Sequence, residues 1–319
     1  PAIKLKNRKT ARPVKENIRM DELVICSKQY IDEEDFKKIN SLKKTVLEDE
    51  EIFLKLELDY KLNLSLNQKQ ELPDQINEWM CYWGDTLIGY LGLCNFGGAD
   101  GELTGMVHPL YRRKGIFTKL YQLALKECKK RGFQKILLVC DHKSSSGLSF
   151  IQSVGGGYSF SEYEMKQSYT AGVSIGGNDI ALIKARNCDV AEIEKQNGLY
   201  FGDNGRTIIL PEDEEKRNRI TYLIWLGSEV IGKIRIDFDF DEGFISGFGI
   251  LPQYRGKGYG RQTLLAALHI IYEKNSHGAA LEVAAENRNA LHLYESCGFK
   301  VTSVTDYYED KSFQATIPY

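Results

Sequence analysis

The alternation of hydrophobic and polar residues predicts one series of elements twice along the chain. Period-two alternation indicates strands, and apolar residues at helical spacing indicate helices. The later series has a hairpin over 221–238, strands over 242–251, 279–286 and 299–309, and helices over 261–274 and 288–297. The earlier series has a hairpin over 80–94, strands over 102–107 and 135–140, and helices over 116–130 and 146–154. Each series opens with a strand and a helical pattern, over 23–39 and 180–196. The pattern predicts an α/β protein with mixed sheets and helices on both faces.

The two series are copies of one sequence. Shifting the chain by 143 positions aligns them without a gap. Identical pairs include Gly84 and Gly227, Pro109 and Pro252, Arg112 and Arg255, Lys114 and Lys257, and Gly115 and Gly258. Such a repeat predicts two related domains, over 21–169 and 178–319, joined by a Gly/Ser-rich linker. The first repeat has extra residues around 54–73.

Composition narrows the function classes. The chain has 319 residues, a formal net charge of -2 and a sequence pI near 6.3, so no overall charge draws it to nucleic acid or an anionic membrane. The first twenty residues are basic, which indicates a solvated tail or an arm that grips a partner or phosphate. No apolar run reaches the roughly 20 residues of a membrane span. Seven scattered cysteines do not indicate a zinc or disulfide framework. We expect a cytoplasmic monomer or homodimer without metal.

The stretch 249–261 has the properties of an anion site. A predicted strand ends at Leu251, and a basic, glycine-rich loop leads directly into a helix. Backbone N–H groups at a helix N-terminus bind phosphate, and Arg255, Lys257 and Arg261 add positive charge. The spacing matches neither the Walker A loop nor the dinucleotide fingerprint. The alternative is a plain strand-to-helix turn.

Two motifs together resemble the GCN5-related N-acetyltransferases (GNAT). The segment R-G-K-G-Y-G after Pro252 is similar to that family's acetyl-CoA pyrophosphate loop. The second signature, N-x-x-A-x-x-x-Y-x-x-x-G-F, is matched by Asn287, Ala290, Tyr294, Gly298 and Phe299. The resemblance covers most of 178–310 and, more loosely, 21–168. It implies two tandem GNAT-like domains, each with a sheet that splays between its fourth and fifth strands and holds the pantetheine arm there. The implied cofactor-binding residues are Phe248, Gly249, Ile250, Leu251, Arg255, Gly256, Lys257, Gly258, Tyr259, Gly260, Arg261 and Asn287.

The resemblance also implies catalytic roles. Tyr294 matches the tyrosine that protonates the leaving thiolate in the family; its alternative role is packing on the sheet. Glu282 lies where ribosomal-protein N-terminal acetyltransferases, which this segment resembles, have a proposed base. Glu282 as a solvated strand carboxylate, Asp241 or Glu242 as the base, and a base acting through water remain alternatives. The backbone N–H of Ile250, near a bulge expected in the strand, is the implied oxyanion donor. Asn287 contacts pantetheine or caps the following helix.

The first repeat has lost these polar side chains. In the shared register Ile151 replaces Tyr294, Ser144 replaces Asn287 and Val139 replaces Glu282. Its loop is partly kept and is a candidate for a second CoA site, formed by Arg112, Arg113, Lys114, Gly115, Ile116 and Phe117. We interpret this repeat as structural, or as binding CoA without turnover. The runs Ser144–Ser146 and Gly155–Gly157 are interpreted as relaxed loops.

The predicted function is transfer of an acetyl group from acetyl-CoA to an amine. The acceptor is a small molecule or a protein N-terminus, and the chemistry lies in the second repeat. A non-catalytic acyl-CoA-binding or regulatory module is the first alternative, favoured less because binding alone does not need Tyr294. A scaffold that uses the basic N-terminal segment is the second.

Overall fold

The computed structural model describes residues 22–67, 75–96, 99–168, 179–202, 209–238, 242–274 and 277–313. The basic segment over 1–20, most of the predicted linker and Asp241 lie outside the described residues.

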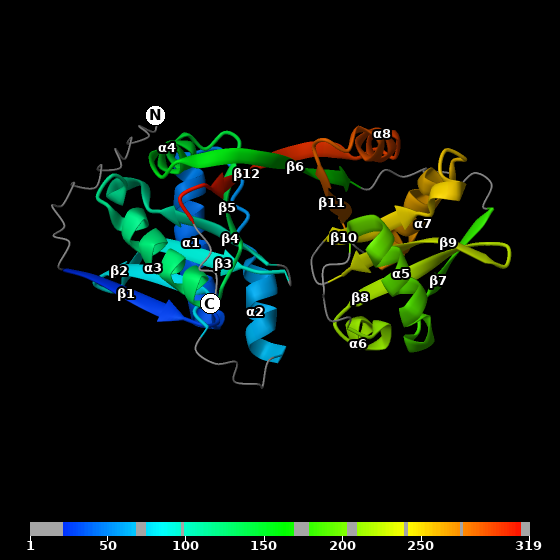
Figure 1. The fold of residues 1–319 in the computed structure, drawn as a ribbon, viewed down its shortest axis with the longest axis horizontal. Helices are drawn as coiled ribbons and strands as arrows, with labels where there is room; N and C mark the ends of the chain where they lie inside the picture. The colour runs from blue at the N-terminus through cyan, green and yellow to red at the C-terminus, as the bar shows by residue number, and fades with distance from the viewer. Residues whose placement is uncertain are drawn as a thin grey trace, which may run out of the picture. The chain divides into compact units, whose positions relative to one another are not determined.

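Both repeats have the predicted elements in the predicted order (Figure 1). The first consists of β1 (Leu23–Lys28), α1 (Glu33–Asp49), α2 (Leu58–Asn67), β2 (Glu78–Trp83), β3 (Thr86–Cys94), β4 (Asp100–Val107), α3 (Ile116–Lys130), β5 (Lys135–Asp141), α4 (Ser145–Ser153) and β6 (Gly156–Ser168). The second consists of β7 (Ile180–Lys184), α5 (Val190–Phe201), α6 (Pro211–Glu215), β8 (Arg219–Leu226), β9 (Glu229–Asp237), β10 (Glu242–Ile250), α7 (Tyr259–Glu273), β11 (Gly278–Ala284), α8 (Arg288–Ser296) and β12 (Lys300–Asp310). The extra residues of the first repeat contain α2.

Two short runs were wrongly interpreted as relaxed loops. The Ser144 hydroxyl accepts the Gly147 N–H at 3.2 Å and caps α4, in which Ser145 and Ser146 lie. Gly155 has a φ of 77° and ends that helix, and β6 begins at Gly156. Serine is a common N-cap and glycine a common residue after a helix, so these positions have a structural role that a decayed motif hides.

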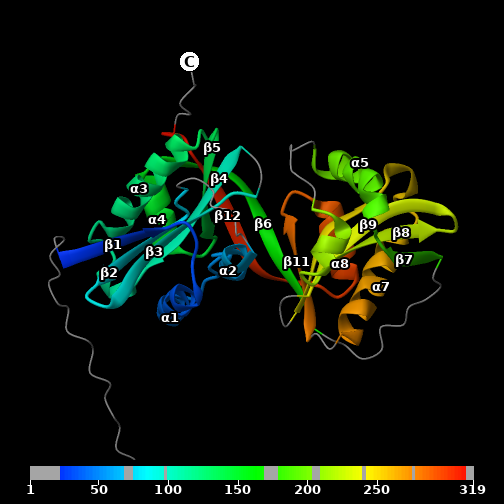
Figure 2. The ribbon, with the colours of Figure 1, turned by 90° about the horizontal axis from the view of Figure 1, so that it is seen from below.

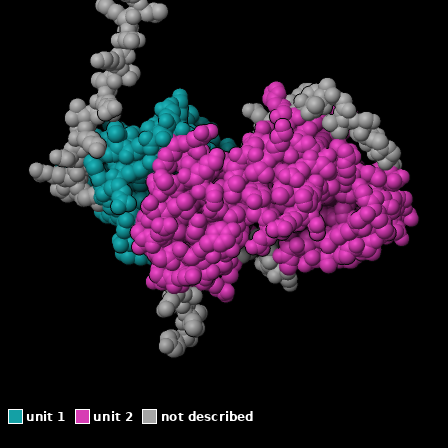
Figure 3. Space-filling model, turned by 90° about the horizontal axis from the view of Figure 1, so that it is seen from above, with its two compact units in different colours: residues 1–49, 58–92, 105–127 teal, residues 50–57, 93–104, 128–319 magenta. Residues whose placement is uncertain are grey.

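The chain forms two compact units that do not follow the repeats (Figure 3). Unit 1 comprises Pro1–Asp49, Leu58–Gly92 and Gly105–Glu127. Unit 2 comprises Glu50–Glu57, Leu93–Thr104 and Cys128–Tyr319, and therefore contains the whole second repeat together with part of the first.

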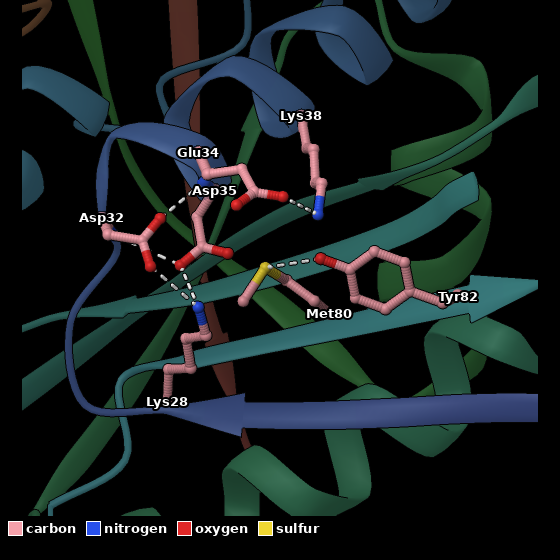
Figure 4. Close-up of polar contacts among 7 residues, drawn as sticks. All are labelled: Lys28, Asp32, Glu34, Asp35, Lys38, Met80 and Tyr82. Carbon is pink, nitrogen blue, oxygen red and sulfur yellow. Dashed lines mark hydrogen bonds and ion pairs between the residues drawn. The ribbon is translucent and has the colours of Figure 1, made fainter. Parts of the chain in front are cut away.

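In unit 1, β2 pairs antiparallel with β1 and β3. The start of α1 is held to the end of β1 by a polar cluster (Figure 4). The Asp35 N–H donates to Asp32 Oδ1 at 2.8 Å, and the Asp32 N–H donates to Asp35 Oδ2 at 3.2 Å. Lys28 Nζ lies 2.5 Å from the buried Asp35 carboxylate. One turn of α1 further on, Lys38 pairs with Glu34 at 2.6 Å. These contacts cap α1 and fix its direction from β1.

In unit 2, the last strands of the two repeats are exchanged. The strand order, from the first part of β4, is β4-β5-β12-β6-β11-β10-β9-β8-β7. Thus β12, the last strand of the second repeat, lies antiparallel between β5 and β6 of the first repeat. In turn, the second half of β6 pairs antiparallel with the whole of β11, from Gly278 to Ala284 (Figure 2). Each repeat therefore completes its sheet with strands of the other.

Helices cover both faces of the second repeat's strands, as predicted. On one face, Leu264, Leu268 and Ile271 of α7 pack with Leu281 of β11 in the main core. On the other face, Ile193 of α5 packs against Leu223 of β8. This arrangement leaves the carboxyl end of β10 between the two layers, where the predicted loop begins.

Candidate active site

The strands β10 and β11 separate, as expected for the family fold. They pair in parallel from Glu242 and Gly278 to Ile245 and Leu281, although β10 continues to Ile250. In the first repeat, β4 and β5 likewise pair only as far as Leu103. The part of β10 beyond Ile245 thus has a free edge toward β11.

A bulge lies in the free part of β10. Its register against β9 shifts between Ser246 and Gly249, and Gly247 has a φ of 56°. The Leu251 N–H donates to Ile231 O of β9 at 2.8 Å. Successive amides of a strand point to opposite edges, so the Ile250 N–H points to the edge from which β11 has separated.

The loop after β10 has the shape that an anion site needs. A 3₁₀ turn over Pro252–Tyr254 leads to Gly256 and Gly258, whose φ values are 74° and 84°. Gly258 is the N-cap of α7, and a helix offers no internal partner for the N–H groups of its first turn. Apart from their chain neighbours, no atom of the described residues lies within 4 Å of a Cβ built on Gly256 or Gly258. The loop therefore presents backbone N–H groups on an open surface.

Arg255 has a role that the sequence did not reveal. Its Nε donates to Ile250 O at 2.8 Å, which ties the loop back to the end of β10. In the first repeat the Arg112 Nε donates to Val107 O at 3.3 Å, in the same register. Arg113 and Gly115 there also have positive φ values, 64° and 78°. Both loops thus share one backbone shape, and the shared arginine helps to close it.

The repeats differ where the loop meets the strand. In the second, Gly260 of α7 faces Phe248 of β10, with 3.8 Å between a built Cβ and the ring. In the first, a Cβ built on Gly105 of β4 would collide with the Tyr90 carbonyl oxygen of β3 and would lie 2.9 Å from the ring of Phe117 of α3. The glycine and the phenylalanine have exchanged sides, so one ring fills this space in either repeat.

Tyr294 is buried against the sheet. It lies in the core formed by α7, α8 and β11, with its ring 6.1 Å from that of Phe299. Burial raises the pKa of Tyr294 to about 12, and neighbouring Cys297 adds to this rise. The hydroxyl is therefore protonated at neutral pH and is able to donate a proton, which is the state that a general acid requires. Ile151 is buried in the first repeat, without a hydroxyl.

Asn287 caps α8. Its side-chain oxygen accepts the Ala290 N–H at 3.2 Å, as Ser144 does for α4. The capping alternative is thus present in the structure, and contact of Asn287 with pantetheine stays a prediction.

Glu282 is paired with a lysine, and its side chain is 30% exposed. Its Oε2 lies 2.7 Å from Nζ of Lys55, whose side chain is 10 % exposed. Lys55 also reaches Glu162 at 3.1 Å and the Tyr307 hydroxyl at 2.9 Å. Burial opposes the charge of Lys55, but the carboxylate of Glu282, then Tyr307 and Glu162, raise its pKa above the usual range. Burial raises the pKa of Glu282, against the effect of Lys55.

Sequence reasoning missed this cluster because Lys55 is remote from Glu282 in the chain. Glu102 of β4 belongs to it too: burial raises its pKa to about 7, with Lys55 opposing and Glu162 contributing. The alternative base Glu242 is bonded to Lys166 at 2.8 Å and lies at the start of β10, at the opposite end from the bulge.

The fold and loops define a class of protein. The profile of the acetyltransferase (GNAT) family matches residues 42–155 and 190–299, so this chain belongs to the GNAT family and carries two GNAT repeats. Within the described residues no helix is long and apolar enough to cross a membrane.

Relatives agree with this assignment. Spermidine N(1)-acetyltransferase of Vibrio cholerae is 45% identical over 110 residues, 34% of this chain and 57% of that protein. The uncharacterized N-acetyltransferase YycN of Bacillus subtilis is 41% identical over 63 residues, 20% of this chain and 40% of that protein. The chain thus spans less than two thirds of these curated relatives.

Solved structures match nearly the whole fold. A GCN5-related N-acetyltransferase from Sphaerobacter thermophilus has a TM-score of 0.72 at 17% identity, covering 91% of this chain and 95% of that one. A tandem GNAT protein from the clavulanic acid biosynthesis pathway has a TM-score of 0.64 at 14% identity, covering 90% and 98%. At these identities the likeness shows the tandem fold.

Proposed function

We propose that this protein transfers the acetyl group of acetyl-CoA directly to a primary amine of a small molecule or a protein N-terminus, in its second repeat. The observation that supports this proposal is that β10 separates from β11 and ends in a glycine-rich loop, while the buried Tyr294 lies in the core to which Ile245 of β10 also belongs. The relatives include the spermidine N(1)-acetyltransferase named above and a putative [ribosomal protein bS18]-alanine N-acetyltransferase of Bacillus subtilis, which is 31% identical over 78 residues.

The residues present fit acetyl-CoA. The amides of Gly256, Gly258 and Gly260, with the positive charges of Lys257 and Arg261, would hold the pyrophosphate. When bound, acetyl-CoA supplies an activated acyl group as a thioester. The Ile250 N–H would stabilise the negative charge that develops on the acyl oxygen, and the Tyr294 hydroxyl would protonate the departing sulfur.

Calorimetric titration of acetyl-CoA tests where it binds. We expect one site per chain in the wild type, weakened by about 100-fold or more in Arg255→Glu/Gly258→Asp, because a new carboxylate at the N-terminus of α7 would repel the phosphates and the loop would lose the bond from Arg255 to Ile250 O. The matched control is Arg112→Glu/Gly115→Asp in the first repeat, which should bind like the wild type. Two sites would instead assign CoA to the first repeat as well, and no binding at all would refute the proposal. Binding without transfer to any amine would favour an acyl-CoA-binding module.

Glu282 remains our candidate base. Lys55 occupies its Oε2, and a carboxylate has further acceptor positions for the proton of an amine or a water. Glu162 provides a matched control, because it is bonded to the same lysine.

We expect Glu282→Gln to lower kcat/KM by about 100-fold or more and Glu162→Gln to change it little. The pKa of Glu282 is raised by burial, so the base is lost as pH falls through a value above the ordinary glutamate range. The acidic limb of the pH–rate profile should therefore lie above that range and flatten in Glu282→Gln. Equal losses in both variants would show that the pair only supports the structure around Lys55.

A further inference from the structure

Lys233 is a buried cation at the bulge. It lies on β9 directly opposite Gly249, and the whole residue is 4% exposed. Its Nζ donates to the carbonyl of Gly247, the bulged residue, at 3.0 Å. The ring of Phe201, at the end of α5, lies 5.4 Å from Nζ.

Among the residues that the structure describes, no carboxylate forms an ion pair with Lys233. Arg235 lies two residues along β9 on the same face. Its Nη1 forms an ion pair with Glu214 Oε1 at 3.4 Å, and its Nε donates to the Ser246 hydroxyl. Burial and, after it, the charge of Arg235 together lower the pKa of Lys233 to about 8, so the amine is still mostly charged at neutral pH. Buried charges are usually paired, because desolvation is costly.

The first repeat neutralises the same place internally. In the shared register Tyr90 replaces Lys233 and Glu78 replaces Thr221. There the Glu78 carboxylate accepts the Tyr90 hydroxyl at 2.6 Å and pairs with Lys61 at 2.7 Å, and the cluster is buried. The catalytically relevant repeat thus lacks the acid that its counterpart has.

Lys233 lies on the face of the sheet that α5 covers. Tyr200 of α5 packs against the Cα of Gly249, the residue paired with Lys233, so that no side chain fits there. The α7 and α8 layer, with Tyr294, covers the other face. Phe201, whose ring lies near the ammonium, is itself 51% exposed, so movement of this ring would open Lys233 to a solute.

We propose that Lys233, supported by Arg235, binds an anionic group of the acyl acceptor next to the bulge. The acceptor is then an amine that also carries a carboxylate or a phosphate. This inference rests on the proposed function and narrows it. A polyamine would bring another cation to Lys233, so spermidine should be a poor acceptor here, unlike for the Vibrio cholerae relative.

The test compares acceptors that differ only in the anion. The probes are the L-amino acids against their carboxamides, phosphoethanolamine against ethanolamine, and spermidine. Two readouts are measured: thiol release from acetyl-CoA, and calorimetric binding of the same amines with CoA present. The variants are Lys233→Met, which removes the charge but keeps the length, and Lys300→Met, an exposed lysine of β12, as the control.

We expect the anionic member of a pair to be preferred about 10- to 100-fold by the wild type and by Lys300→Met, since a bond to a charged group contributes that much. Lys233→Met should abolish this preference and leave the uncharged member nearly unaffected, which loss of a structural contact to Gly247 would not do. Preference for the amino acids identifies a carboxylate, and preference for phosphoethanolamine identifies a phosphate.

A second variant adds the missing acid. Thr221→Glu reproduces the first repeat's Glu78 and should suppress the anion preference while the protein stays folded. Equal use of both members of each pair, or a preference that survives in Lys233→Met, would overturn the subsite but leave the transferase intact. If no amine is acetylated although acetyl-CoA binds, the transferase proposal fails. In that case calorimetric binding of the amines tests the anion subsite separately. If the anionic and uncharged members of a pair bind equally, the subsite is overturned.

Discussion

Replacing Tyr294 with phenylalanine is expected to lower kcat by about 10²- to 10⁴-fold. The substitution removes only the hydroxyl, and the ring keeps its place against Phe299 in the core. The thioester sulfur would then leave without a proton, while acetyl-CoA binding and its dissociation constant stay nearly unchanged. Because the pKa of Tyr294 is raised to about 12, its hydroxyl is protonated below that value, and this residue should not limit the rate between pH 7 and about 10.

Tyr222 is the matched control for this variant. It is a buried tyrosine of the same core, and burial also raises its pKa. Tyr222→Phe should keep the activity of the wild type, with thermal stability changed to a similar extent as in Tyr294→Phe. If Tyr294→Phe kept most of its activity, the acid would lie elsewhere, and the first repeat would return as a candidate active site.

Separating the two repeats is expected to unfold both. A fragment of residues 1–169 lacks β12, which pairs with β5 from Thr305 to Glu309 and with β6 from Lys300 to Asp310. A fragment of residues 178–319 lacks β6, the partner of β11 from Gly278 to Ala284. Each would expose unpaired strand edges and part of its apolar core to water, so we expect aggregation or loss of cooperative melting.

Mixing or co-expressing the fragments should restore a folded complex, because the exchanged strands carry their pairing information in sequence. Circular dichroism and size-exclusion chromatography of each fragment and of the mixture measure this. A fragment 178–319 that is monomeric and melts cooperatively at the temperature of the full chain would contradict the expectation. It would instead support the domain boundaries proposed from the repeat alone.

The order of elements could be predicted because it depends on local pattern. The hairpin at Gly227, the helix after Gly258 and the end of α8 before Gly298 all follow from spacing and turn residues. The strand exchange could not be predicted, because the alternation in 300–310 indicates a strand but does not indicate which strand it pairs with. Both repeats end in a similar strand, and only tertiary packing selects the neighbour.

In the candidate site too, the features set by local sequence could be predicted and those set by tertiary contacts could not. The loop and Tyr294 are contained in motifs of short range, and the structure places the loop at the end of the splayed strand β10. The pairing of Glu282 with Lys55 depends on residues far apart in the chain, as does the contact between Lys233 and the Gly247 carbonyl. Periodicity indicates which side of a strand a residue faces, but it does not identify a charge that arrives from another element.

The exchanged glycine and phenylalanine constrain how the first repeat is able to change. Removing the ring of Phe117 alone would restore a glycine at the loop position but leave an empty space against Gly105, at a cost of about 3–5 kcal/mol. A side chain added at Gly105 would collide with the backbone carbonyl of Tyr90 in β3 as well as with the ring of Phe117. A return to the arrangement of Gly260 and Phe248 therefore requires both substitutions together with a shift of the backbone between β3 and β4. Selection acting on single substitutions would hold the first repeat in its present form, whatever advantage a second acetyl-CoA site offered.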